Sequence, residues 1–312
     1  MSFKYLILGA GGTGGPIGAY LNRAGKDVTL IARGEHLRVL REQGLKIEKA
    51  WEGPEKFQIP SYGTEDYQDR PDVIFVCVKG YSLEKTVPFI RRISGPGTVV
   101  IPILNLYGTG RKLQRELPDR MVTDGCIYIS ANLREPGTLF MHGKIFRIFY
   151  GMPDHRTDEP KLKKVEADLR EAGIEGHYSP QIEKDAMQKF SYVSPMAACG
   201  LYYDAEAGDM QRPGKERELF SQLIEEIQLL AESLGIRYDL RLRDVNLDIL
   251  DHLAPTASTS MQRDIAEGKP SEIDGLIFEV DRLARQQGLK LPGYQKVTEA
   301  FRRRGYIPAE DE

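Results

Sequence analysis

With 312 residues, of which 41% are hydrophobic, the chain is long enough to build two domains of ordinary size, each with its own core. Its formal net charge of -3 gives no general electrostatic reason to bind nucleic acid or an anionic membrane surface. The longest apolar runs, such as residues 73–78, are far shorter than the roughly 20 residues that span a bilayer.

The cysteines and histidines show no pattern of metal ligands or disulfides. Cys77, Cys126 and Cys199 lie far apart without a C-x-x-C pair, and the histidines show neither H-x-x-x-H nor H-E-x-x-H spacing. We therefore expect no metal site. The first predicted strand begins almost at Met1, which leaves no room for a signal peptide, so we expect a cytoplasmic protein.

The first fifteen residues carry the pattern of a turn that binds nucleotide phosphates. An apolar run at residues 5–8 precedes three glycines with G-x-G-x-x-G spacing. In this pattern the first glycine permits a tight turn, the second lets backbone N–H groups approach a pyrophosphate, and the third lets the helix pack close to the strand. The candidate cofactor-binding residues here are Gly9, Ala10, Gly11, Gly12, Thr13 and Gly14.

The surrounding sequence completes a βαβ unit. Residues 17–21 continue as a helix, Gly25 ends it, and residues 27–32 form a second buried strand. The alternative interpretation is a glycine-rich turn without a ligand, and the βαβ context favours the nucleotide site.

The end of the second strand bears on the choice of cofactor. In NAD-binding folds an acidic residue here takes the ribose hydroxyls, whereas an arginine accommodates the 2′-phosphate of NADP. The strand ends in Arg33, which favours NADP because a guanidinium matches a phosphate in bidentate geometry. Two alternatives stay open: Arg33 caps a turn, or Glu35 serves NAD.

A third buried strand, at residues 72–79, ends in Lys79. Ligands of doubly wound sheets bind beyond the carboxyl ends of the strands, so we expect the Lys79 ammonium to face the cofactor. The alternative is a solvated loop lysine. The next strand, at residues 98–104, ends in Asn105, whose amide is placed to contact nicotinamide, ribose or substrate.

The other predicted elements complete two domains. Residues 121–149 alternate in short runs between Gly and Pro turns and predict antiparallel strands at the far edge of the sheet. From residue 181 onward the apolar spacing is helical. The fold class is therefore α/β, with a Rossmann-type doubly wound sheet over residues 1–180 and a helical substrate domain over residues 181–312, and a cleft between them. The helices expected after residue 181 cover residues 182–200, 213–234, 243–253 and 271–287.

Two polar stretches of the second domain, residues 182–195 and 258–274, hold the candidates for chemistry. The second contains S-M-Q-R-D at residues 260–264, followed by G-K-P-S-E-I-D at residues 268–274. Together with the Gly9 fingerprint, Arg33, Lys79, Asn105 and Lys189, these motifs resemble the ketopantoate reductase (2-dehydropantoate 2-reductase) family over essentially the whole chain. The resemblance departs at Ser271, where the family has Thr.

The resemblance implies an NADPH-dependent oxidoreductase that acts on a CH–OH group. Such enzymes reduce 2-dehydropantoate to pantoate in pantothenate and coenzyme A biosynthesis, and their helical domain is of the 6-phosphogluconate-dehydrogenase-like type. By this resemblance Lys189 donates the proton, Glu272 holds a substrate hydroxyl and also contacts the cofactor, and Ser260 binds the substrate carboxylate. Asn105 orients the substrate and the nicotinamide, while Arg33 and Lys79 take the 2′-phosphate.

Elementary chemistry agrees with these roles and leaves simpler alternatives open. Desolvation in a closing cleft would lower the pKa of Lys189 toward a useful value for a general acid; the alternative is a surface lysine. Ser271, with Asp274 three residues on, predicts a capping-box variant that places Glu272 in the first turn of a helix. Glu272 could instead serve only that helix, and Ser260 could be a helix cap.

The chain also departs from the family pattern. It has Asn105-Leu106 where the family commonly has Asn-Gly, and three substrate-contacting asparagines are replaced by Val193, Ala197 and Ala257. Apolar replacements leave substrate hydroxyls unsatisfied at a cost of roughly 1–3 kcal/mol each. Side chains that could compensate are those of Ser191, Tyr192 and Ser194.

The sequence therefore predicts an NADPH-dependent reductase of a small 2-oxo acid, with ketopantoate as the leading substrate. A reductase of a more apolar 2-oxo acid is the first alternative. A non-catalytic NADPH-binding sensor is the second, and the presence of both Lys189 and Glu272 argues against it. The composition does not decide whether the chain forms a homodimer.

Overall fold

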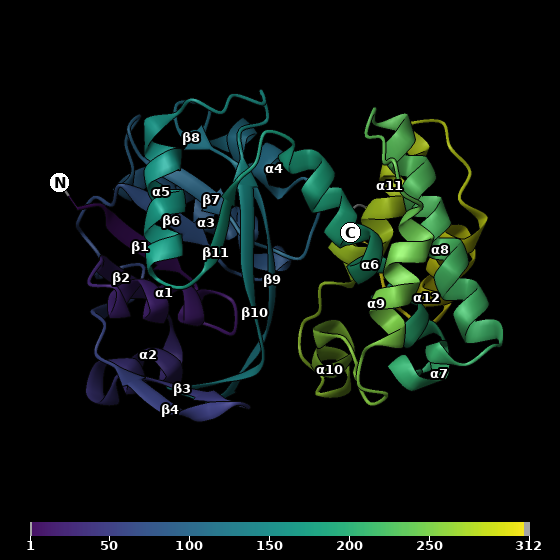
Figure 1. Cartoon of the computed structure of the whole chain (residues 1–312), viewed down its shortest axis with the longest axis horizontal. Helices are drawn as coiled ribbons and strands as arrows, with labels where there is room; N and C mark the ends of the chain where they lie inside the picture. The colour runs from purple at the N-terminus through teal and green to yellow at the C-terminus, as the bar shows by residue number, and fades with distance from the viewer. Residues whose placement is uncertain (1, 309–312) are drawn as a thin grey trace. The chain divides into compact units, whose positions relative to one another are not determined.

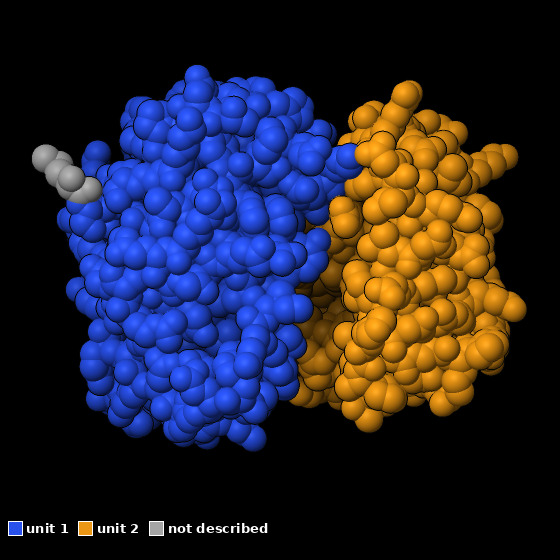
Figure 2. Space-filling model, viewed as in Figure 1, with its two compact units in different colours: residues 1–104, 108–186 blue, residues 105–107, 187–312 orange. Residues whose placement is uncertain are grey.

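The computed structural model describes residues 2–308, and the chain divides into two compact units (Figure 2). Unit 1, blue in the figure, runs to Leu104 and resumes over Gly108–Ala186. Unit 2, in orange, consists of Asn105–Tyr107 and the chain from Met187 onward. A segment of three residues therefore leaves the first unit, joins the second, and returns.

Unit 1 is built on a six-stranded parallel sheet, which confirms the predicted Rossmann-type architecture (Figure 1). The spatial order is β5-β2-β1-β6-β7-β8, so the strand order reverses between β1 and β6. The strands are β1 (Lys4–Leu8), β2 (Asp27–Ile31), β5 (Ser61–Tyr62), β6 (Val73–Val76), β7 (Val99–Pro102) and β8 (Met121–Val122).

The sequence explains why these strands are central. All four residues of β6 and of β7 are buried, as expected for parallel strands covered on both faces. Helices connect them in the pattern of a doubly wound sheet. These are α1 (Gly14–Arg23), α2 (Gly34–Gln43), the 3₁₀ turn η1 (Gly80–Ser82), α3 (Leu83–Ile93), α4 (Thr109–Glu116) and α5 (Pro160–Glu171).

The prediction that residues 121–149 lie at the far edge of this sheet is wrong beyond residue 122. The chain instead builds a second, five-stranded sheet, in which the long hairpin of β9 and β10 is joined by strands from elsewhere in unit 1. Its members are β3 (Leu45–Lys49), β4 (Glu52–Phe57), β9 (Asp124–Glu135), β10 (Thr138–Gly151) and β11 (Glu175–Tyr178).

Burial of the apolar face of β10 explains this arrangement. Leu139 and Met141 alternate before a register shift in the strand, Phe146, Ile148 and Tyr150 alternate after it, and all five are nearly or fully buried. They belong to the same hydrophobic cluster as Ile17 of α1 and Leu162 of α5. The second sheet therefore contributes to the core that also buries these helices, which an extension of the first sheet's edge would not do.

Unit 2 is helical, as predicted. Its helix α8 carries the fully buried Phe220, Leu223, Ile224, Ile227 and Leu230, and contacts α7, α9, α11 and α12. The elements are α6 (Ile182–Tyr203, in unit 2 from Met187), α7 (Ala207–Gln211), α8 (Lys215–Ser233), α9 (Leu242–Asp251), α10 (Ser260–Ala266), the π-helical turn η2 (Asp274–Phe278), α11 (Glu279–Gln286) and α12 (Pro292–Arg303).

Three of these helices were not predicted. Helices α7 and α10 have five and seven residues, too few to show a clear apolar period. Helix α12 did offer a signal, because it begins with Pro292 and buries Tyr294, Val297 and Phe301 at helical spacing.

One histidine ties the glycine turn to two other parts of unit 1. Nε2 of His36, on α2, lies 2.9 Å from the carbonyl oxygen of Ala10, and its Nδ1 accepts a 2.9 Å hydrogen bond from the Gly137 N–H in the β9–β10 turn. Since Nδ1 is an acceptor, the neutral ring carries its proton on Nε2 and donates to Ala10. Burial lowers the pKa of His36 below its ordinary value of 6.5, and the hydrogen bond to Ala10 only partly opposes this.

His36→Phe is expected to lower the free energy of unfolding by about 1–2 kcal/mol at neutral pH, because it leaves the Ala10 carbonyl and the Gly137 N–H without their ring partner. The native state favours neutral His36, so its contribution is complete above pH 6.5 and is lost as the pH falls through the lowered pKa. Denaturant unfolding at several pH values should show the difference between wild type and variant shrinking below pH 6.5.

His252 provides a control of opposite sign. It is exposed, and its pKa is raised by a hydrogen bond to the Asp248 carbonyl and by the Asp248 carboxylate. A raised pKa gives stability at low pH that is lost as the pH rises, so the effect of His252→Gln should grow on acidification. A His36→Phe effect that also grew on acidification would contradict the assignment.

Candidate functional site

The glycine turn follows β1 at the point where the strand order of the parallel sheet reverses. Gly9 has φ +104°, and a Cβ there would meet the Cys77 carbonyl oxygen at 2.8 Å. At Gly14 a Cβ would lie 2.1 Å from the Gly9 carbonyl oxygen, whereas at Gly11 it would meet nothing within 4 Å. The first and third glycines thus make the close turn, and the second leaves open space beside the backbone, as a phosphate requires.

The middle of the turn is covered by a strand that sequence reasoning did not connect with it. A Cβ on Gly12 would meet the Ala131 carbonyl oxygen at 2.6 Å and Cα of Asn132 at 2.9 Å, both on β9. Ala10 is buried, and the half-buried Thr13 immediately precedes α1. The contact of Gly12 with β9 has no local sequence signal, because it depends on the second sheet.

Arg33 and Glu35 differ in how they are engaged. Arg33 is exposed at the residue before α2, and its side chain makes no capping hydrogen bond there. The Glu35 carboxylate accepts two hydrogen bonds from the Arg38 guanidinium, at 2.9 and 2.5 Å, and these hold the pKa of Glu35 below its usual value. Both side chains of this ion pair are more than half exposed, so the pair does not exclude the acidic alternative for a ribose contact.

Lys79 follows β6, the neighbour of β1 at the reversal of strand order. Its side chain is half-buried, and its carbonyl accepts the Ser82 N–H at 2.9 Å to close the turn η1. The structure therefore puts Lys79 at the carboxyl edge of the parallel sheet, where ligands of this fold bind.

In unit 2 the structure brings Asn105 and Lys189 together. The Lys189 ammonium donates a 2.7 Å hydrogen bond to Oδ1 of Asn105. Lys189 lies on α6 and is only 9% exposed, which rules out the alternative of a surface lysine. An almost buried ammonium held by a side-chain amide is a suitable proton donor.

The neighbours of Asn105 anchor it in the same unit. Leu106 lies against Gly275 of η2: a Cβ on that glycine would be 2.7 Å from Cδ1 of Leu106. The ring of Tyr107 lies 6.1 Å from that of Phe190, the residue after Lys189. Leu106, noted above as a departure from the family, is thus accommodated by a residue without a side chain.

The position of Glu272 relative to the helix differs from the predicted one. The carbonyl of Glu272 accepts the Leu276 N–H at 2.9 Å, so Glu272 stands directly before the helix, and the prediction that Ser271 caps it is wrong. Asp274, expected in a capping box, accepts two hydrogen bonds from Arg282. The Glu272 side chain is 6% exposed.

Ser260 is the first residue of α10 and is half-buried. The cap of this helix is Thr259, which forms a capping box with Gln262, so the alternative that Ser260 is the cap is wrong. The Ser260 hydroxyl is therefore not used to cap this helix.

The three apolar replacements differ in exposure. Val193 is half-buried on α6, four residues after Lys189 and therefore on the same face of the helix. Ala197, one turn further, is fully buried, and Ala257 is half-buried in the loop before α10. Val193 and Ala257 are thus the departures with surface still available to a ligand.

The side chains expected to compensate are engaged elsewhere. The hydroxyl of Ser194 contacts the Leu276 carbonyl oxygen and Oη of Tyr294, both at 2.6 Å, and Ser191 is bonded to Asn246. The Tyr192 hydroxyl is buried, which raises its pKa to about 12, and no hydrogen-bond partner is found for it among the described residues. None of the three therefore presents an accessible polar group in place of the missing amides.

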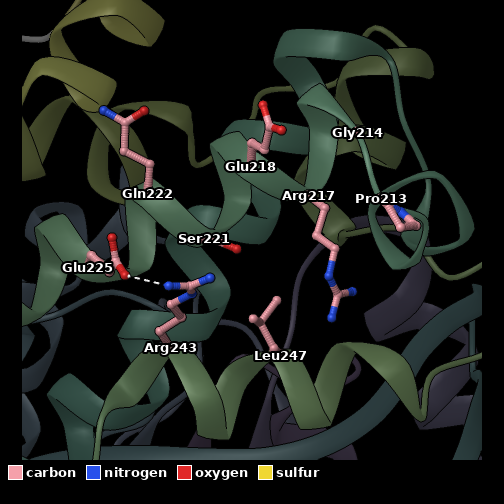
Figure 3. Close-up of a pocket in the computed structure, with 9 residues that line it drawn as sticks. All are labelled: Pro213, Gly214, Arg217, Glu218, Ser221, Gln222, Glu225, Arg243 and Leu247. Carbon is pink, nitrogen blue, oxygen red and sulfur yellow. Dashed lines mark hydrogen bonds and ion pairs between the residues drawn. The ribbon is translucent and has the colours of Figure 1, made fainter.

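Helices α8 and α9 line a hollow of about 410 Å³ that is separate from these residues (Figure 3). Arg217 on its wall is already paired with Asp251 at 2.7 Å, and Arg243 with Glu225 at 3.0 Å. None of the predicted site residues lines it. Among residues 2–308 no group of three or more His, Cys, Asp or Glu is arranged to hold a metal ion.

Two models of known families match most of the chain. The model described as "Ketopantoate reductase PanE/ApbA" matches residues 5–154, and "Ketopantoate reductase PanE/ApbA C terminal" matches residues 181–305. A curated relative, the 2-dehydropantoate 2-reductase of Aquifex aeolicus, is 24% identical over 318 aligned positions, with 100% of each chain covered.

Solved structures agree with the fold. The 2-dehydropantoate 2-reductase of Methylococcus capsulatus superposes with a TM-score of 0.86 at 21% identity, covering 99% of this chain and 100% of the other. A D-mandelate dehydrogenase in a ternary structure with NADH and anilino(oxo)acetate gives a TM-score of 0.85 at 22% identity. The match covers 95% of this chain and 96% of the other. A ketopantoate reductase of Staphylococcus aureus described as dimeric gives 0.82 at 19% identity, covering 96% and 98%.

No helix within the described residues is both long and apolar enough to cross a membrane. The ranges that the two family models match include the glycine turn, Asn105 and most of the helical unit. Members of this family are oxidoreductases that use a pyridine nucleotide and act on a CH–OH group of a small molecule. The chain belongs to the ketopantoate reductase family.

Proposed function

We propose that this chain is an NADPH-dependent reductase of a small 2-oxo acid, with 2-dehydropantoate as its leading substrate and pantoate as the product. The observation that carries the proposal is the nearly buried Lys189 ammonium, held at 2.7 Å by Asn105. The names of curated relatives support the substrate. With that substrate, we place the enzyme in pantothenate and coenzyme A biosynthesis. The dimeric relative supports a homodimer, and we assign the enzyme to the cytoplasm.

The residues of unit 1 fit a bound nicotinamide dinucleotide. When bound, NADPH supplies the hydride that reduces the keto carbon. The open backbone at Gly11 leaves room for the pyrophosphate, next to the N-terminus of α1. Arg33 and Lys79 are the cations assigned to the 2′-phosphate, and the exposed guanidinium of Arg33 at the end of β2 supports NADPH over NADH. Unit 1 is thus assigned to the cofactor, and unit 2, which includes Asn105–Tyr107, to the substrate.

The residues of unit 2 supply the proton and orient the substrate. Lys189 donates a proton to the oxygen that becomes the hydroxyl, because hydride addition to the keto carbon places negative charge on that oxygen. Asn105 holds the ammonium and orients the substrate next to the nicotinamide. Glu272 accepts a hydrogen bond from the substrate hydroxyl and contacts the cofactor, and Ser260 donates to the substrate carboxylate.

Lys189→Ala should lower kcat for ketopantoate by about 10²–10⁴, the usual contribution of a positioned general acid, with little change in NADPH affinity. The measurement is the loss of nicotinamide absorbance with ketopantoate and a panel of branched 2-oxo acids. Lys215→Ala is the control, since that side chain is 69% exposed. Wild-type protein that binds NADPH tightly but reduces none of these acids would contradict the enzyme assignment and favour a sensor.

Arg33→Ala should raise the KM for NADPH by about 10- to 100-fold, since the loss of a charge-assisted contact costs about 1.5–3 kcal/mol. The KM for NADH should change little, because NADH has no 2′-phosphate. Initial rates with each cofactor on the same preparations provide the internal control. An equal rise in KM for both cofactors would show that Arg33 does not bind the 2′-phosphate.

A more apolar 2-oxo acid is the second candidate substrate. It is favoured by Val193 and Ala257 and by the engagement of Ser191 and Ser194, which leave no replacement for the missing amides. The structural similarity to a D-mandelate dehydrogenase is compatible with it.

Val193→Asn separates the two candidates. An amide one turn from Lys189 should raise kcat/KM for ketopantoate about tenfold relative to the analogue that has hydrogen in place of the hydroxyl. Val193→Leu, which adds bulk without polarity, is the matched control. Wild-type protein that already prefers ketopantoate strongly, with no gain from the amide, would exclude the apolar candidate.

A further inference from the structure

We propose that Leu106 and Gly275 are a matched pair of positioning residues that fix Asn105, and through it the Lys189 ammonium. This inference rests on the proposed role of Lys189 as proton donor. Neither residue carries a group that reacts. Their role is to set where the amide oxygen of Asn105 lies, and therefore where the ammonium is held.

The contact between the two residues is close and depends on the missing side chain of Gly275. A Cβ at this position would lie 2.7 Å from Cδ1 and 2.9 Å from Cδ2 of Leu106, well inside van der Waals contact. Gly275 has no positive φ that would itself require glycine. A methyl group at 275 would therefore require the half-buried Leu106 side chain to move.

Gly275 lies in a π-helical turn, η2, in which the regular helical ladder is interrupted. The turn is fixed to the helix of the proton donor, because the Ser194 hydroxyl on α6 donates 2.6 Å to the Leu276 carbonyl. Ser194 lies five residues beyond Lys189. The surface that receives Leu106 and the helix that carries Lys189 are thus directly bonded to each other.

A second contact holds the other side of the same segment. Tyr107 lies against Phe190, which follows Lys189 on α6. Tyr107 therefore attaches the segment 105–107 to α6 itself, and Leu106 attaches it to η2, which is hydrogen-bonded to α6. A 2.7 Å hydrogen bond tolerates a displacement of only a few tenths of an ångström, so movement of Leu106 by the radius of a methyl group is enough to weaken it.

The test is a double-mutant cycle of Leu106→Ala and Gly275→Ala. Leu106→Ala removes the anchor, and Gly275→Ala pushes Leu106 away. In the double variant, the new methyl group at 275 fills part of the space that the shortened side chain at 106 leaves empty. Each single variant should lower kcat about tenfold at unchanged NADPH affinity, and the double variant should recover to within about threefold of wild type.

A readout that does not need turnover separates this inference from the proposed function. Acylation of Lys189 by acetic anhydride, followed by peptide mass mapping, reports how firmly the ammonium is held; the exposed Lys215 is the internal reference. Acylation should rise about tenfold in each single variant and fall again in the double variant. If wild-type protein reduces no 2-oxo acid, the proposed function fails while the acylation pattern still decides the positioning role.

Gly143→Ala is the matched control, because a Cβ there meets nothing within 4 Å. Single variants with wild-type acylation, or a double variant whose effects simply add, would overturn the inference. Should Gly275→Ala not fold, the series Leu106→Val and Leu106→Ala tests the same point. Acylation should then rise as the side chain shrinks, and an unchanged rate would overturn the inference.

Discussion

The hydrogen bond from Lys189 to Asn105 joins residues that are 84 positions apart in sequence. For it to form, the chain must leave the parallel sheet after β7, place three residues in the helical unit, and return to begin α4. Much of unit 2 near this point serves that requirement: the aromatic contact of Tyr107, the absence of a side chain at Gly275, and the bond of Ser194 to the π-helical turn. The short hydrogen bond of Asn105 is thus supported by the packing of Leu106 and Tyr107, the two residues that follow it.

The glycine turn of unit 1 is governed by space rather than by polarity. Gly9 and Gly14 are surrounded by backbone that excludes a Cβ, and Gly12 is pressed against β9. Only Gly11 has open space beside it. The turn is thereby fixed by the first sheet beneath it, by the second sheet beside it, and by His36, which links Ala10 to the β9–β10 turn. The conformation of the glycine turn consequently depends on contacts from residues well outside its own six.

The elements with strong local patterns were predictable. The βαβ start, the buried strands that end near Lys79 and Asn105, and the apolar period of α8 are all read from residues within a few positions of one another. The antiparallel hairpin of β9 and β10 was predicted too, but its place in a second sheet was not, because β10 also pairs with β3 and β11, and pairing between distant strands leaves no local trace. The π-helical turn was missed for a related reason: residues 273–280 keep a helical period while the hydrogen bonding changes.

The split membership of segment 105–107 has a consequence for recombination between family members. The chain passes between the units at three places, after Leu104, after Tyr107 and after Ala186, so they are not separable by one cut. A chimaera that exchanged only the residues after Ala186 would receive a foreign helical unit but keep the native Asn105-Leu106-Tyr107. Such a hybrid would place the native Leu106 against a foreign residue at position 275, so the second unit, which is discontinuous in the gene, has to be exchanged in both of its parts to keep this contact.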